Sequence, residues 1–228
     1  MDWGPIIISL KTAVTAIFIT FFLGVFTAKA VVGMKHAKAK MIIDGILTLP
    51  LVLPPTVAGF ILLLIFGIKR PLGSFLFEVF GVKIVFTWTA TVIAAVAVSF
   101  PLMYRSARGA FEQVDENLVY AARTLGLSEK KIFWRIILPL ALPGVASGAV
   151  LAFARGLGEF GATAMLAGNI AGETRTLPMA IYSAVAAGNM AEASGYVLII
   201  MILSFLVVVL MNYSAHKNKA PWKGEGFY

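Results

Sequence analysis

The chain has 228 residues, of which 60% are hydrophobic and only 13% are charged. Its mean hydropathy is +0.91, and because so few charges cannot cover the surface of a soluble domain of this size, the composition excludes an ordinary soluble protein. Cysteine is absent, which excludes disulfides and thiolate metal sites, and no metal is expected in this chain.

Five apolar stretches are long enough to cross a bilayer, which requires about 20 mostly apolar residues. In chain order they cover residues 6–32, 41–68, 84–103, 136–153 and 196–213. Residues 156–190 are rich in Gly and Ala but carry charges, which predicts broken helix and a re-entrant segment that faces protein. A sixth span within this stretch is the alternative. The sequence therefore predicts an all-α integral membrane protein with a single transmembrane domain, residues 1–228.

The second apolar stretch is interrupted by three prolines, Pro50, Pro54 and Pro55. Each removes a backbone donor and clashes with the preceding turn, and a helix surrounded by other helices tolerates this better than one facing lipid. The residues alone leave two interpretations open: a merely bent helix, and a flexing helix that lines a transport pathway.

The basic residues are distributed unevenly across these spans. With five spans and the N-terminus outside, thirteen of the 19 Lys and Arg lie inside, five lie outside, and Arg155 lies at membrane depth. The inner set comprises Lys29, Lys35, Lys38, Lys40, Arg105, Arg108, Arg123, Lys130, Lys131, Arg135, Lys217, Lys219 and Lys223. Because positive residues collect in cytoplasmic loops, we expect a cell-membrane protein with its N-terminus outside and its C-terminus cytoplasmic. The same distribution accounts for the net charge of +8 without a nucleic-acid partner.

The longest polar interruption, at residues 104–135, has a helical pattern of its own. Apolar and small residues recur there at helical spacing, namely Val114, Leu118, Ala121, Ala122 and Leu125. Asp115 is placed as an N-cap, Gly126 as a C-terminal stop, and Ser128 at the start of a second short helix. The pattern predicts a cytoplasmic helical hairpin with a small Ala-Ala face. Such a face permits docking of another protein, and an amphipathic helix lying on the lipid headgroups is the alternative.

This hairpin resembles the cytoplasmic signature of ABC-importer permeases, E-A-A, three residues, G, nine residues, I-x-L-P. The matching positions are Ala121, Ala122, Gly126, Ile136, Leu138 and Pro139. Only the first position differs, because Tyr120 stands where the signature has Glu. The resemblance implies a type I ABC importer permease fold, with a coupling loop at about residues 105–135 whose helices dock an ATPase. The implied docking residues are Tyr120, Ala121, Ala122, Arg123, Leu125, Gly126, Leu127, Ile136, Leu138 and Pro139.

The resemblance extends over most of the chain and is closest to the permeases of molybdate transport systems. The similar segments are residues 49–59, 121–126, 153–162 and 172–178. Sulfate permeases share much of residues 158–161, which indicates tetrahedral oxyanions in general, while the run at residues 172–178 favours molybdate. The implied function is import of molybdate, or of the similarly sized tungstate. A permease for sulfate or another oxyanion and an ion-coupled secondary transporter are the alternatives.

Two groups of residues are expected to serve the substrate. The group that would line or gate the pathway comprises Pro50, Pro54, Pro55, Arg155, Gly158, Glu159 and Gly161. Arg155 and Glu159 share one helix face because they stand four residues apart; a locked ion pair, a part in closing the pathway and direct contact with the anion all remain open. The group expected toward the outside, where an anion would enter, comprises Asn169, Thr174, Arg175 and Thr176. A solvated loop that meets the binding protein is the alternative for this outer group.

The chain contains no phosphate-binding loop of the form G-x-x-x-x-G-K-[ST]. It is therefore not expected to be an enzyme or to bind a cofactor, and ATP with Mg²⁺ would be held by a separate ATPase subunit. The resemblance implies assembly in the lipid membrane with a second copy of the chain, two ATPase subunits and an extracytoplasmic oxyanion-binding protein.

Overall fold

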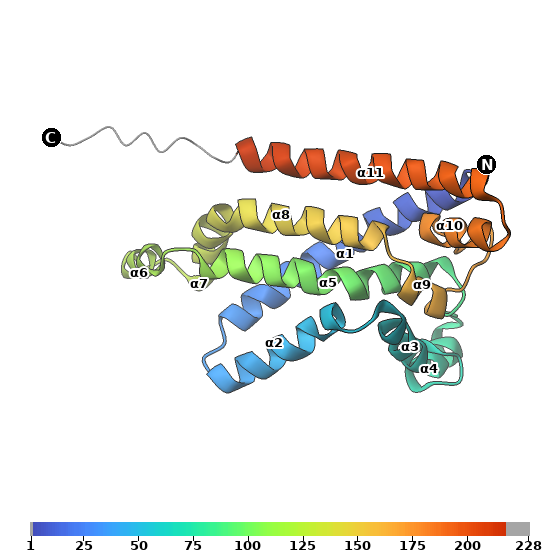
Figure 1. The fold of residues 1–228 in the computed structure, drawn as a ribbon. Helices are drawn as coiled ribbons and strands as arrows, with labels where there is room; N and C mark the ends of the chain where they lie inside the picture. The colour runs from blue at the N-terminus through green and yellow to red at the C-terminus, as the bar shows by residue number, and fades with distance from the viewer. Residues whose placement is uncertain (1, 218–228) are drawn as a thin grey trace.

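The computed structural model describes residues 2–217, and the surroundings of side chains as far as residue 209. Every regular element in this part of the chain is helical (Figure 1). The elements are α1 (Gly4–Val32), α2 (Ala37–Val52), α3 (Pro55–Phe66), α4 (Pro71–Phe80), α5 (Trp88–Glu112), α6 (Glu116–Thr124), α7 (Glu129–Ile132), a π-helical segment (Phe133–Ile137), α8 (Leu138–Leu157), α9 (Gly161–Leu166), α10 (Leu177–Ala186) and α11 (Met190–Lys217). Helices α6 and α7 lie at one end of the molecule, the hairpin end, and α3, α4, α9 and α10 lie toward the opposite one, the far end (Figure 1). Lys219 and Lys223, two of the basic residues expected inside, lie outside the described residues.

Four helices within residues 2–217 are long and apolar enough to cross a membrane. They are Gly4–Val32, Trp88–Glu112, Glu129–Leu157 and Met190–Val209. Helices α2 and α3 pass the same test only together, as a pair with a sharp bend between them, so four of the five predicted spans are confirmed in length and composition and the second is a bent pair. No sixth span lies between α8 and α11, because α9 has 6 residues and α10 has 10.

The third span is longer than its apolar stretch. Helix α5 ends at Glu112 rather than at residue 103, and its last turns carry polar side chains. An ion pair of 3.0 Å between Arg108 Nε and Glu112 Oε1 joins neighbouring turns, and such pairs four residues apart stabilise a helix outside the apolar region.

Helices α1, α5 and α8 form the main core. Its buried side chains include Val25 and Ala28 of α1, Met103 and Tyr104 of α5, and Val145 of α8. Because lipid is as apolar as these side chains, close packing and interhelical hydrogen bonds hold the helices together. Buried hydroxyl pairs supply two such bonds between α1 and α5. The pairs are Thr12 with Thr91 at 2.9 Å and Thr20 with Ser99 at 3.1 Å.

The second predicted span is broken rather than merely bent. Leu53, between α2 and α3, has an extended backbone with ψ of 140°, and the two helices form an angle of 114°. Pro54 and Pro55 account for the break, because proline lacks an N–H and disfavours helical conformation in the residue before it. The prolines of residues 41–68 predict a bend, but the size of the angle depends on where α3 packs.

Helix α3 packs on α9 at van der Waals distance through two glycines. A Cβ added to Gly59 would lie 2.6 Å from Ala162 Cα, and one added to Gly161 would lie 2.9 Å from Pro55 Cβ. Both distances are too short for any side chain, so glycine is required here by the approach of the two backbones. This contact fixes α3 at the far end of the molecule.

Replacing Gly59 by Ala should therefore destabilise the protein. We expect Gly59→Ala to lower the free energy of unfolding by about 1–3 kcal/mol, the usual cost of overpacking, as measured by thermal unfolding in detergent. Gly45→Ala is the matched control, because Gly45 lies within α2 and a Cβ there meets nothing within 4 Å. Equal stability of the two variants would contradict the close α3–α9 contact.

Candidate docking hairpin and transport pathway

The first helix of the predicted hairpin, α6, has both ends fixed by local hydrogen bonds. The Asp115 carboxylate caps its N-terminus by accepting a bond of 2.9 Å from the backbone N–H two residues further on. Its C-terminus is closed by Gly126, which has a φ of +77°. The N–H of Gly126 donates to the Arg123 carbonyl and that of Leu127 to the Ala122 carbonyl, as in a Schellman motif. The predicted cap and stop are both confirmed.

The second arm of the hairpin differs from the prediction. Ser128 does precede a helix, but α7 is only four residues long and runs through the π segment into α8. Pro139 favours this wider turn because it has no N–H to donate to the carbonyl four residues earlier. In the π segment the N–H of Leu138 donates to the carbonyl of Phe133, five residues back. The second arm is therefore the beginning of the next span rather than a separate short helix.

Most of the expected docking residues are accessible from outside the protein. Tyr120 is 54% exposed and Leu125 is 81% exposed; Ala121, Arg123, Gly126 and Pro139 are also exposed, and Leu127, Ile136 and Leu138 are half-buried. Ala122 is only 3% exposed. The prediction of an outward Ala-Ala face is therefore wrong for Ala122, which packs inward and holds α6 against the protein. Ala121 alone offers the outer surface a small side chain.

An ion pair ties α6 to the start of α7. Arg123 Nε lies 2.7 Å from Glu129 Oε1, and Arg123 Nη2 lies 3.2 Å from Glu129 Oε2, so the two planar groups meet as a fork. The hydrogen-bonded carboxylate raises the pKa of the Arg123 guanidinium. The Tyr120 hydroxyl donates to Glu116 at 3.3 Å. Glu116, which the sequence analysis missed, thus places a carboxylate one turn before the position where the signature has Glu.

Several predicted pathway residues meet where α8, α9 and α3 join. Arg155 Nη1 and Glu159 Oε2 lie 2.7 Å apart, which confirms that the two residues pair. The Glu159 side chain is 2% exposed, and its other oxygen accepts a bond of 2.7 Å from the Ala162 N–H in the first turn of α9. Gly161 packs on Pro55 beside the break between α2 and α3. The ion pair therefore caps a short helix as well as neutralising two charges.

The remaining pathway residues lie at or near helix ends. Pro50 lies within α2 close to its end, and Pro54 is the N-cap of α3. Gly158 is the C-cap of α8, with a φ of −87°, which any residue can adopt. The backbone of Gly158 therefore makes no use of the freedom of glycine, in contrast to the close approach at Gly161.

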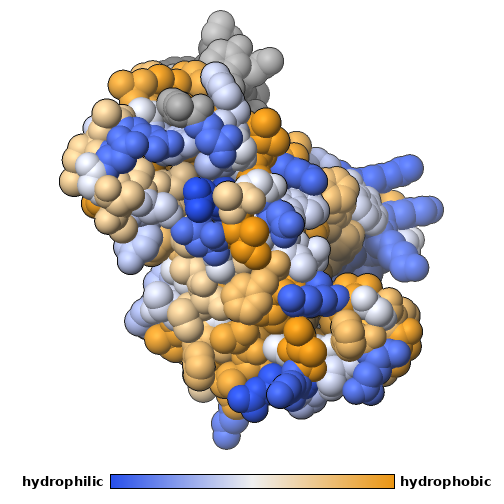
Figure 2. Space-filling view, turned by 90° about the vertical axis from the view of Figure 1, so that its right-hand side faces the viewer, coloured by the Kyte–Doolittle hydropathy of each residue, from blue (hydrophilic) through white to orange (hydrophobic). Residues whose placement is uncertain are grey.

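The four residues expected at the outer end lie together between α9 and α10, at the far end. Arg175 Nε donates to Asn169 Oδ1 at 2.9 Å. Thr174 and Thr176 are 0% and 4% exposed, and Thr174 accepts a hydrogen bond from the backbone of the same loop. Neither hydroxyl is therefore exposed to solvent, and their part in receiving an anion stays a prediction. In Figure 2, which views the far end, hydrophilic side chains lie among larger apolar areas, and Arg175 and Asn169 are the members of the group that solvent reaches.

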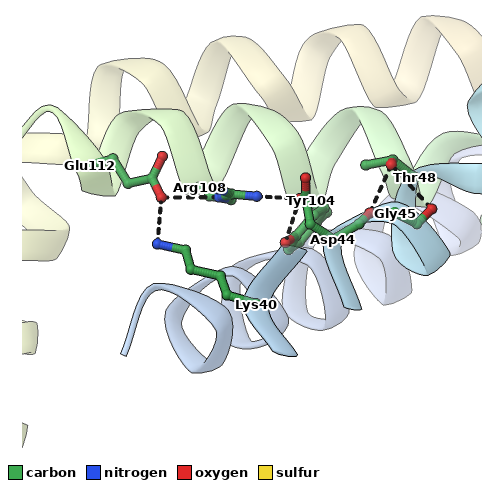
Figure 3. A network of polar contacts seen from close by, with 7 residues as sticks. All are labelled: Lys40, Asp44, Gly45, Thr48, Tyr104, Arg108 and Glu112. Atoms are coloured by element: carbon green, nitrogen blue, oxygen red, sulfur yellow. Dashed lines mark hydrogen bonds and ion pairs between the residues drawn. The ribbon is translucent and has the colours of Figure 1, made fainter. Parts of the chain in front are cut away.

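A polar network between α2 and α5 was not predicted from the sequence (Figure 3). It joins Lys40 and Asp44 of α2 to Tyr104, Arg108 and Glu112 of α5. A signal was present, because the residues on each helix are spaced by four and therefore share a face. The spacing along each helix does not indicate that the two faces meet.

Two solved structures share the fold of this chain. A chain of the MetNI methionine ABC transporter, in an inward-facing conformation, superposes with a TM-score of 0.73 at 18% identity, covering 95% of this chain and 97% of that chain. A chain of a bacterial ABC transporter involved in the import of alginate superposes with a TM-score of 0.73 at 13% identity, covering 95% and 79%. The fold is that of a type I ABC importer permease, as the hairpin signature implied.

The chain belongs to the family of binding-protein-dependent transport system inner membrane components, whose sequence profile matches residues 20–219. It is 41% identical over 211 residues to the molybdenum transport system permease protein ModB of Escherichia coli (strain K12), which covers 92% of both chains. It is 43% identical over 204 residues to the putative molybdenum transport system permease protein YvgM of Bacillus subtilis (strain 168), which covers 90% of this chain and 89% of that one. The family resemblance stated from the motifs is confirmed.

The buried ion pair predicts a coupled effect of two substitutions. Arg155→Leu leaves the buried Glu159 carboxylate without its counter-charge, and we expect a loss of about 2–3 kcal/mol in the free energy of unfolding. Adding Glu159→Gln removes the unpaired charge and should recover part of the lost stability. Thermal unfolding of the single and double variants measures this recovery. Strictly additive losses would contradict the pairing.

Proposed function

We propose that this chain is the permease subunit of an ATP-driven importer of molybdate. The assignment of molybdate as the substrate rests on the 41% identity over 92% of both chains to a protein named as a molybdenum transport system permease. Tungstate fits the same proposal, because the two oxyanions are alike in charge and size. ATP and Mg²⁺ would be held by a separate ATPase, which drives the cycle.

The proposed ATPase site is the outer surface of the hairpin, on the cytoplasmic side of the membrane. Exposed Tyr120 and Leu125 offer apolar contact area, the Glu116 carboxylate lies beside Tyr120, and the Glu129 carboxylate pairs with Arg123. The charge distribution of the sequence supports this orientation, with the N-terminus outside and the C-terminus cytoplasmic. Two copies of the permease would each bind one ATPase subunit, and the far end would receive the oxyanion from an extracytoplasmic binding protein.

The position of the hairpin between two spans supports a mechanical role. Helix α6 follows α5 after a short connection, and α7 continues directly into α8. A displacement of the hairpin by the ATPase would therefore move α5 and α8, and α8 ends beside the Arg155–Glu159 pair at the junction of α8, α9 and α3. Rigid-body movement of packed helices is a common way to open a site alternately to either side.

Reconstituted transport tests the substrate. With the ATPase and the binding protein present, we expect uptake of radiolabelled molybdate into proteoliposomes only when ATP is supplied. Tungstate should compete at concentrations similar to molybdate, and sulfate should compete only weakly. Equal competition by sulfate would contradict molybdate as the substrate, and uptake on an ion gradient without ATP or ATPase would contradict the importer class.

A glycine substitution tests the docking surface. Gly126→Asp should abolish co-purification of the ATPase, because it places a charged side chain on the hairpin surface. Gly188→Asp is the matched control, because Gly126 and Gly188 have φ of +77° and +74° and a Cβ at either position meets nothing within 4 Å. Gly188 lies between α10 and α11, away from the hairpin, so this variant should still bind the ATPase. Intact binding by Gly126→Asp would contradict docking at this surface.

A further inference from the structure

Four charges and one hydroxyl form a ladder between α2 and α5 (Figure 3). At one rung Lys40 Nζ lies 2.9 Å from Glu112 Oε1. At the next rung Asp44 pairs with Arg108 and accepts a hydrogen bond of 2.9 Å from the Tyr104 hydroxyl. Arg108 also pairs with Glu112 along α5 at 3.0 Å. The two positive and two negative charges balance, so the ladder is electrically neutral.

Helix α2 depends on this ladder for its position. None of its residues is fully buried, and only Ile43 and Leu47 pack, partly buried, against the main core. At its other end α2 breaks away from α3 at Leu53. Since α3 is fixed on α9 through Gly59, α2 is an arm with a proline break at one end and the ladder at the other.

The ladder also lies next to the docking hairpin in the chain. Arg108 and Glu112 occupy the last turns of α5, and only residues 113–115 separate that helix from α6. A force applied to α6 therefore reaches the rungs of the ladder before it reaches the rest of α5. Lys40 and Asp44, on the other side of the ladder, then transmit this force to α2, the helix that contains Pro50.

The ladder is partly exposed, and such a contact can keep α2 and α5 together during a movement while its ion pairs rearrange. Its four charged side chains are 23–39% exposed. A fully exposed pair adds little stability, whereas a fully buried pair would be very costly to rearrange. A network of half-buried rungs holds more firmly than one pair and keeps contact with water.

We propose that this ladder is a coupling link, which makes α2 follow α5 when the ATPase displaces the hairpin. Lys40, Asp44, Arg108 and Glu112 are positioning residues in this proposal, because they act on the pathway through the Pro50–Pro55 break and not by contact with the anion. The inference rests on the proposed transport function. It predicts that the ladder determines how much substrate moves for each ATP hydrolysed.

Charge reversal tests the link. Lys40→Glu with Asp44→Lys reverses the charges of α2, and Arg108→Glu with Glu112→Lys reverses those of α5. Either double variant sets like charges opposite each other at both rungs, and we expect molybdate uptake per ATP hydrolysed to fall about tenfold, equivalent to roughly 1.4 kcal/mol. The quadruple variant restores opposite charges at both rungs and should return this ratio to within about twofold of the original.

The controls separate coupling from folding and docking. Lys38→Glu makes the same charge change as Lys40→Glu at an exposed position of α2 outside the ladder, and should leave the ratio unchanged. Each variant is checked for thermal unfolding and for co-purification with the ATPase. If a double reversal fails to fold, Lys40→Gln with Glu112→Gln replaces it. We expect this milder variant to lower molybdate uptake per ATP hydrolysed about threefold. An unchanged ratio in the folded variants, no recovery in the quadruple variant, or loss of ATPase binding would overturn the coupling link. Absence of ATP-driven molybdate uptake in the unmodified protein would instead defeat the proposed function.

Discussion

Inside a bilayer the backbone must satisfy its own hydrogen bonds, because hydrocarbon offers no water to unpaired N–H and C=O groups. This constraint accounts for the helical form of every regular element in the described residues and restricts where a helix can be interrupted. The interruption at Leu53 lies beside α3, which packs on α9, and the one after Gly158 lies beside Glu159, whose carboxylate accepts from the backbone of α9. Both breaks therefore lie beside contacts with α9, and both lie among the residues assigned to the pathway.

The two ends of the molecule are held together by different kinds of contact. At the far end, Gly59 and Gly161 bring two backbones together with no room for a side chain, so the contact is rigid. At the hairpin end, α6 is held by the half-exposed Arg123–Glu129 fork and α2 by the partly exposed ladder. Exposed ion pairs are weak and easily rearranged. The end proposed to meet the ATPase is thus the end whose contacts can adjust.

Tyr120 stands where the signature has Glu, and in the structure it contacts a neighbouring carboxylate. The Tyr120 hydroxyl contacts Glu116 one turn earlier on the same face of α6, so a carboxylate stays near the proposed docking surface. The shape of α6 does not depend on that position, because the Asp115 carboxylate caps one end and backbone hydrogen bonds at Gly126 and Leu127 close the other. A change at Tyr120 therefore alters the surface of α6 and leaves its fold in place.

The sequence by itself determined the helical class, four of the five spans, the cap at Asp115, the stop at Gly126 and the Arg155–Glu159 pair. These features depend on hydropathy and on residues at most four apart, so neighbours in the chain specify them. Only the tertiary structure decided that α2 and α3 form an angle of 114°, that Ala122, Thr174 and Thr176 are buried, and that Lys40 and Asp44 face Arg108 and Glu112. Each of these depends on contacts between segments far apart in the chain, and local patterns carry no information on which faces of two helices meet.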